Sequence, residues 1–308
     1  MQIFYISSKI WLMICEVIFL FKKNKKALYD FKRNQLPQNR VALVLDIIKM
    51  RWIVLLKLGI ILLFFGIPII IFQILLNINL YEINLSYSLG HIDQEYAMKA
   101  TFDAVMIGNL ILIVLLCIFG ISLSGVLKSI RHLIWQDPVF IGHDFKAGIK
   151  SHIYAVSMSF LIIGIANFIF QYVLLGSSFR EETLLQTIAL VFSIVLLITS
   201  LIVALFVIMQ STLYNLSFTH IYKNALLMTM HYFFSSLIVM VINLAPWLLL
   251  RLPLESYFIF LFSFLFMLVP INLLVLMSYA YHIFDDLINK ANYPNIYRKG
   301  LYSDDAKN

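Results

Sequence analysis

Long uncharged, apolar runs alternate with short polar connections along this chain. Six of these runs reach or exceed the roughly 20 apolar residues that an α-helix needs to cross the hydrocarbon core of a bilayer. Their boundaries fall near 52–76, 104–127, 153–176, 184–209, 224–250 and 256–280. The pattern predicts an all-α fold, a polytopic transmembrane helix bundle with six spans.

One further apolar stretch covers residues 3–21, but it differs from the six runs. Lys9 and Glu16 lie seven residues apart and therefore on one narrow face of a helix. Such a face favours a helix that lies in the membrane interface, and a seventh membrane helix is the alternative. No basic region precedes the stretch and no small-residue cleavage site follows it, so a signal peptide is not expected.

The distribution of Lys and Arg predicts the orientation. Connections 22–51, 128–152, 210–227 and 281–308 together hold 18 Lys or Arg, whereas connections 77–103, 176–183 and 251–256 hold 3. Because basic residues are retained on the cytoplasmic side, the C-terminus is predicted to be cytoplasmic. Three parts are expected: an N-terminal amphipathic helix and basic cytoplasmic segment (1–51), a six-helix transmembrane domain (52–280) and a cytoplasmic tail (281–308). The tail is expected to be a helix end followed by disorder.

Two of the basic connections contain short amphipathic segments. Ile141, Phe145, Ile149 and Ile153 recur every four residues, which predicts a short helix leading into the third span. In residues 215–226, Ser217 can cap a second such helix. The expected contacts with a partner protein or with lipid head groups are Phe145, Lys146, Lys150, Tyr222 and Lys223. The hairpin of spans two and three resembles the hairpin of spans four and five, through either duplication or convergence.

Composition excludes a soluble globular protein. Hydrophobic residues make up 62% and charged residues 13% of the chain, and the mean hydropathy is +0.91, against about 25% charged residues in soluble domains. The net charge of +7 sits at the ends of the apolar runs, so the expected partners are the bilayer and its anionic head groups, with no nucleic acid. Cys15 and Cys117 are the only cysteines, and neither a disulfide framework nor a metal site nor a cofactor is expected.

The predicted spans contain amides rather than charges. Apart from Lys57, no charged residue lies deep in a span, which argues against proton coupling through a buried carboxylate. Amides at similar depth in the outer half are Asn109, Asn167, Gln171 and Asn243, with Asn272 nearer the inner side. They form either a polar pocket open to the outside or interhelical hydrogen bonds worth roughly 1 kcal/mol each. No catalytic or phosphate-binding motif occurs, so we expect no enzyme.

Residues 120–152, GISLSGVLKSIRHLIWQDPVFIGHDFKAGIKSH, resemble the YesL-like integral membrane proteins of Gram-positive bacteria, a family defined by a domain of unknown function. The residues that carry the likeness are Gly125, Lys128, Arg131, Trp135, Asp137, Asp144, Phe145 and Lys150. Residues 56–68 and 215–228 also resemble segments of this family. The resemblance implies a bacterial cytoplasmic membrane and an accessory or regulatory role near carbohydrate transport, with no catalytic or ligand residues to carry over. The alternative function is a small-solute transporter or channel whose polar path passes the outer amides.

Overall fold

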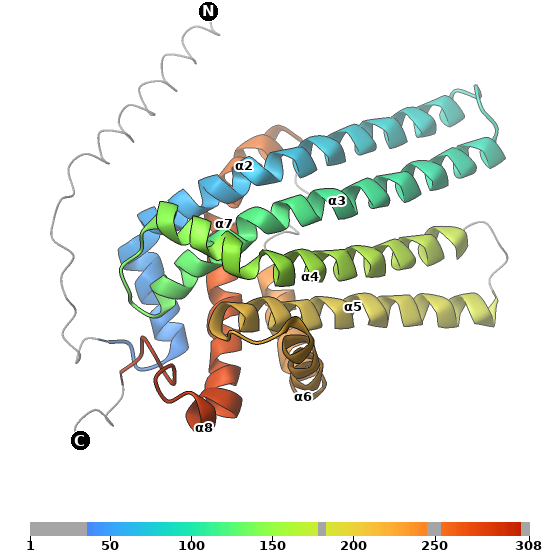
Figure 1. Ribbon diagram of the computed structural model, residues 1–308. Coiled ribbons are helices and arrows are strands. Elements are labelled where there is room, and N and C mark those ends of the chain that lie inside the picture. Colours follow the sequence, from blue (N-terminus) through green and yellow to red (C-terminus); the bar gives the residue numbers. More distant parts are fainter. Residues whose placement is uncertain (1–35, 178–182, 245–253, 303–308) are drawn as a thin grey trace, which may run out of the picture. The chain divides into compact units, whose positions relative to one another are not determined.

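Six long helices make up most of the part of the chain that the structure describes. The computed structural model describes residues 36–177, 183–244 and 254–302. The long helices are α2 (Arg40–Ser88), α3 (Gln94–Ile134), α4 (Ile141–Ser177), α5 (Leu184–Leu213), α6 (Phe218–Leu244) and α7 (Leu254–Phe284) (Figure 1). Six helices among the described residues are long and apolar enough to cross a membrane, which confirms the predicted polytopic helix bundle. The helix expected at 3–21 lies outside the described residues.

The helices pack mainly in chain order. The most extensive contacts join α3 to α4, followed by α4 with α5, α2 with α3, α2 with α7 and α5 with α6. Figure 1 shows α2 with α3, and α4 with α5, as long antiparallel hairpins lying side by side. We call the end with the α3–α4 and α5–α6 connections the basic end, and the opposite end, with the α2–α3 connection, the acidic end.

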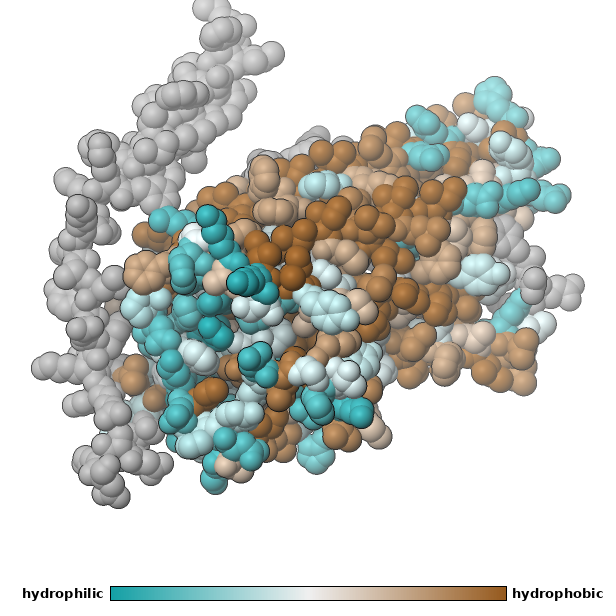
Figure 2. Space-filling model, viewed as in Figure 1, coloured by the Kyte–Doolittle hydropathy of each residue, from teal (hydrophilic) through white to brown (hydrophobic). Residues whose placement is uncertain are grey.

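An uncharged band separates the two ends. From Lys57 to Glu82 on α2, and from Asp103 to Lys128 on α3, the chain runs about 25 residues without another charge, which is roughly 37 Å of helix. This length exceeds the hydrocarbon core of about 30 Å. Figure 2 shows hydrophobic residues over the middle of the hairpins and hydrophilic residues gathered at the two ends. The band therefore matches the membrane-spanning part of a multi-pass membrane protein.

The acidic connection is much shorter than expected. Residues 77–103 are expected from their polar content to form a loop, but α2 continues to Ser88 and α3 begins at Gln94. Asp93 caps α3 by accepting a hydrogen bond from the Tyr96 amide at 2.7 Å. The expected loop is therefore wrong. Leu80, Ile83 and Ser86 follow one another at a spacing of three residues and are half-buried, so this extension keeps one side of the helix against the bundle.

The compact unit begins at Pro37, before the expected domain boundary at residue 52. Asn39 caps α2 through the Ala42 amide at 2.8 Å, and the helix then kinks at Arg51. Residues 40–51 therefore belong to the bundle and not to a separate basic segment. The helices predicted in the two amphipathic segments are present, because α4 begins at Ile141 and α6 begins directly after Ser217. The Ser217 hydroxyl lies 2.7 Å from His220 Nδ1, so its expected role as a cap for α6 stays a prediction.

The tail, as far as it is described, is folded against the bundle. Helix α7 continues into a π-helix, η3 (Asp285–Asn289), and a short α8 (Lys290–Asn292). Leu301 is buried, and the Tyr302 amide donates to the Pro37 carbonyl at 3.0 Å. Gly300 has a positive φ of 86° and packs so closely on the Ile134 carbonyl that a Cβ would overlap it. The expected disorder is therefore wrong for residues 293–302, since tertiary contacts order a segment with little apolar periodicity.

Candidate functional site at the basic end

A buried ion pair joins the two ends of the described chain. Nη2 of Arg40, at the start of α2, lies 2.6 Å from Oδ2 of Asp285, and the two side chains are 9% and 6% exposed. Arg40 Nη1 also donates to the Lys299 carbonyl at 3.1 Å. Its guanidinium carbon lies 5.9 Å from the centre of the Tyr281 ring. Because a buried charge is costly without a partner, each member requires the other.

The π-helix η3 builds the rest of this network. Asp285 Oδ1 accepts from Asn289 Nδ2 at 2.8 Å and from the Arg298 amide at 3.2 Å. The Tyr214 hydroxyl donates to Asn289 Oδ1 at 2.6 Å. Burial, and then the nearby Asp285 carboxylate, raises the pKa of Tyr214, which keeps the phenol protonated as the donor. The Thr212 and Tyr281 hydroxyls, 3.0 Å apart, complete the network. We call its residues the inner polar cluster: Arg40, Thr212, Tyr214, Tyr281, Asp285 and Asn289.

A second set of contacts ties the tail to the α3–α4 connection. Lys299 Nζ lies 3.0 Å from Asp137 Oδ2 and 4.0 Å from the centre of the Trp135 ring. The Arg131 guanidinium lies 4.8 Å from the same ring and donates to the Thr212 carbonyl. Trp135 therefore lies within cation–π distance of two cations. Three of the residues behind the family resemblance, Arg131, Trp135 and Asp137, take part in this contact.

Asp144 organises the connection itself. Its side chain is 2% exposed and accepts from His132 Nδ1 at 3.1 Å and from the Phe140 amide at 2.9 Å. His143 Nδ1 lies 3.4 Å away on the other oxygen. These contacts fix the turn between α3 and α4. In the described part of the chain, no group of three or more His, Cys, Asp or Glu could hold a metal ion.

The outer amides form pairs instead of one continuous layer. Asn167 Nδ2 on α4 donates to Asn109 Oδ1 on α3 at 2.8 Å, and Asn109 Nδ2 donates to the Val105 carbonyl. Asn272 Nδ2 on α7 donates to the Asn243 backbone carbonyl at 3.0 Å. Asn272 therefore lies level with Asn243, and its expected position nearer the inner side is wrong. These contacts favour interhelical hydrogen bonding, and the cavities described below are lined by other residues.

The remaining predicted residues fall into two groups. Gln171 is half-buried, four residues after Asn167. Phe145 and Tyr222 are also half-buried. Phe145 packs so closely on Gly125 that a Cβ at Gly125 would overlap the Phe145 ring. The centre of the Tyr222 ring lies 5.8 Å from that of Phe218. The exposed members of the predicted contact set are Lys146, Lys150 and Lys223. The bundle thus holds the aromatic residues and leaves the lysines exposed.

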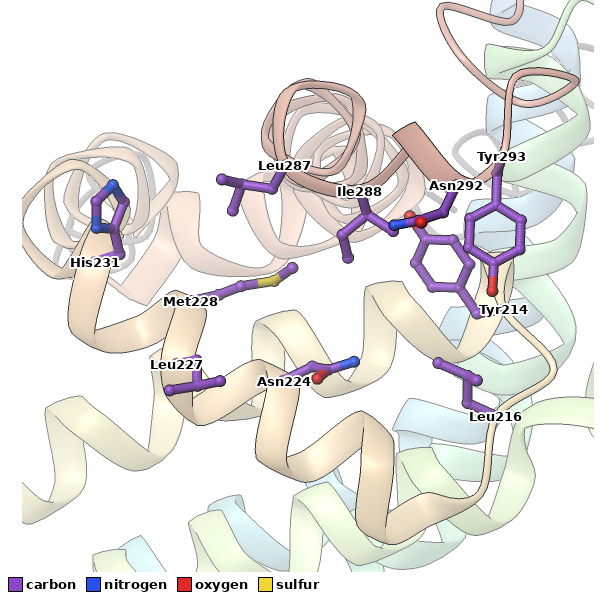
Figure 3. Close-up of a pocket in the computed structure, with 10 residues that line it drawn as sticks. All are labelled: Tyr214, Leu216, Asn224, Leu227, Met228, His231, Leu287, Ile288, Asn292 and Tyr293. Carbon is purple, nitrogen blue, oxygen red and sulfur yellow. The ribbon is translucent and has the colours of Figure 1, made fainter. Parts of the chain in front are cut away.

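A groove beside the inner polar cluster has no counterpart among the sequence predictions. It has a volume of about 670 Å³ and lies between the α5–α6 connection, α6 and the η3–α8 segment. Figure 3 shows Leu287 and Ile288 facing Met228 across it, with His231 at one end and two tyrosines at the other. Its lining residues are Tyr214, Leu216, Asn224, Leu227, Met228, His231, Leu287, Ile288, Asn292 and Tyr293. They come from two segments about 60 residues apart, so local periodicity cannot reveal them.

The basic end therefore combines a rigid polar support with an accessible, mostly apolar groove. Tyr214 belongs to both, since its hydroxyl bonds Asn289 while its ring lies 5.2 Å from that of Tyr293 in the groove. This arrangement suits binding better than proton transfer or metal chemistry. Comparisons with protein-family models, with curated proteins and with solved structures found no match to this chain.

Proposed function

We propose that this chain is a non-enzymatic, YesL-like protein of a bacterial cytoplasmic membrane that acts as an accessory or regulatory partner of a carbohydrate transport system. The kinship rests on residues 120–152 and on the two shorter likenesses at 56–68 and 215–228. The role rests on the groove at the basic end. No charged pathway through the described parts of α2 and α3 competes with it, because no charged residue lies between Lys57 and Glu82 or between Asp103 and Lys128.

The groove is the observation that carries the proposal. Its volume of about 670 Å³ lies within the range of binding pockets, roughly 300–1,000 Å³. Apolar side chains such as Leu287 and Met228 supply its contact area. Amides such as Asn224 and Asn292 supply hydrogen-bonding groups that can orient a bound segment. The exposed Lys223 directly precedes the lining residue Asn224, and the exposed Lys290 lies two residues from Ile288 and from Asn292. These features suit an amphipathic helical segment with acidic residues, from the cytoplasmic side of a transport subunit.

A photo-crosslinking amino acid placed at Leu287 in the full-length chain is expected to capture a transport subunit in native membranes. Leu287 is 45% exposed within the groove, and Leu45, at 63% exposed on α2, is the matched control outside it. With the crosslinking residue kept at Leu287, Leu227→Glu in the groove and Lys223→Glu beside it should each lower recovery of that subunit by about tenfold, since interface residues of this kind contribute roughly 1–2 kcal/mol. Recovery of lipid alone, equal capture from Leu45, or solute uptake by the chain alone in proteoliposomes would each overturn the accessory role.

The acidic end is expected to face the outside of the cell. Tyr87, at the end of α2, is 46% exposed, so Tyr87→Cys in a chain without Cys15 and Cys117 should react with a membrane-impermeant maleimide on intact cells. Asp286→Cys, at the basic end with a side chain 60% exposed, should react only after permeabilisation. The reverse pattern would contradict the orientation drawn from the basic connections.

A further inference from the structure

A second cavity at the basic end lies between α3, α4 and the end of α5. Its volume is about 380 Å³. The floor is polar and buried, formed by His152, Ser211 and Thr212. The rim carries Ser151, Tyr154, Asn215 and Leu216, all of them exposed. The cavity is therefore open at the protein surface, and polar side chains form its floor.

His152 is the unexplained group in this cavity. The residue is 4% exposed, yet neither ring nitrogen has a hydrogen-bond partner. The backbone of Ser211 lies next to the His152 ring, but the two do not form a hydrogen bond. Buried polar side chains almost always have partners, because an unpaired one costs free energy. An unpaired imidazole that lines an open cavity indicates a missing ligand.

The positive charge around the cavity indicates that the ligand is an anion. Arg131 lines the cavity, and its Nε is buried with no partner. Arg131 and Lys128 both exert a positive electrostatic influence on the His152 ring. The lining residues include no Asp or Glu. Two unused N–H groups in a positive environment fit the oxygens of an anion, and Arg in particular suits phosphate.

The depth of the cavity suits a phosphate. Lys128, where the uncharged band of α3 ends, marks the level at which the hydrocarbon core gives way to head groups. Arg131 follows it by one helical turn, and His152 directly precedes the predicted third span. We propose that this cavity binds a phosphate group through Arg131 and His152, supplied either by an anionic phospholipid or by free phosphate.

The test uses the purified full-length chain in detergent, with two probes. Retention of phosphatidylglycerol through delipidation is followed by native mass spectrometry, and binding of inorganic phosphate to the delipidated protein is followed by calorimetry. We expect at least one probe to bind. Binding of phosphatidylglycerol alone identifies the lipid as the source, and binding of inorganic phosphate identifies the free anion. Binding of neither overturns the proposal.

Two variants and one control separate the cavity from general attraction to a basic surface. His152→Leu and Arg131→Gln should each weaken binding of the probe by about tenfold or more, as expected for a lost charge-assisted hydrogen bond. His152→Leu should keep the thermal stability of the wild type, because His152 has no partner to lose. Lys49→Gln removes an exposed positive charge on α2, outside the cavity, and should bind as the wild type does. Unchanged binding by His152→Leu, or an equal loss in Lys49→Gln, would overturn the proposal.

Discussion

Replacement of Asp285 by asparagine is expected to lower the free energy of unfolding by about 3–5 kcal/mol, the range for breaking a buried ion pair from one side. The substitution keeps the size of the side chain but leaves the Arg40 guanidinium buried without its carboxylate, from which it is now 2.6 Å away. It also weakens the acceptor for Asn289 Nδ2 and the Arg298 amide. Unfolding in mixed micelles with a denaturing detergent, followed by tryptophan fluorescence, measures the change.

The neighbouring carboxylate provides a matched control. Asp286 pairs only loosely with His282, at 3.9 Å, and both side chains are more than half exposed. Asp286→Asn should therefore change the free energy of unfolding by less than about 1 kcal/mol. The double substitution Arg40→Met with Asp285→Asn should cost less than the sum of the two single ones, because no unpaired charge remains. Equal losses for Asp285→Asn and Asp286→Asn would show that the buried pair has no special role.

The spans could be predicted because a helix that crosses a membrane has a feature that is visible in the sequence alone. Any helix that crosses hydrocarbon needs a long apolar run, whatever it packs against. The start of α4 at Ile141 was predictable for a related reason, since its apolar residues recur every four positions. The helical extension through residues 77–88 was missed because polar residues resemble a loop when a helix continues beyond the bilayer.

The inner polar cluster could not be predicted, because its contacts join distant parts of the chain. Arg40 and Asp285 are 245 residues apart, and in the sequence each is one charge among many at the ends of apolar runs. The folded tail was missed for the same reason, since Lys299 gains its order from Trp135 and Asp137 on α3 and its connection. The one local signal was Asp285 itself, a carboxylate directly after an apolar run.

The contact between α2 and α7 yields the second large effect, because it depends on the absence of a side chain at Gly59. A Cβ at this position would overlap the backbone carbonyl oxygen of Phe266, an atom that cannot move without shifting α7. Small residues let membrane helices approach this closely, and the close approach is the source of their attraction. Gly59→Ala should therefore separate α2 from α7 and lower the free energy of unfolding by about 3 kcal/mol, the upper part of the range for overpacking.

Gly66 on the same helix is the control for this prediction. A Cβ there would meet only the Phe119 ring, at an ordinary contact distance of 3.8 Å. Gly66→Ala should therefore leave stability unchanged or raise it by about 0.5–1 kcal/mol, since alanine favours a helix over glycine. The same denaturing-detergent titration compares the two variants. If Gly59→Ala is as stable as Gly66→Ala, the α2–α7 contact does not depend on backbone proximity, and the support that α7 gives to Asp285 must come from its other neighbours.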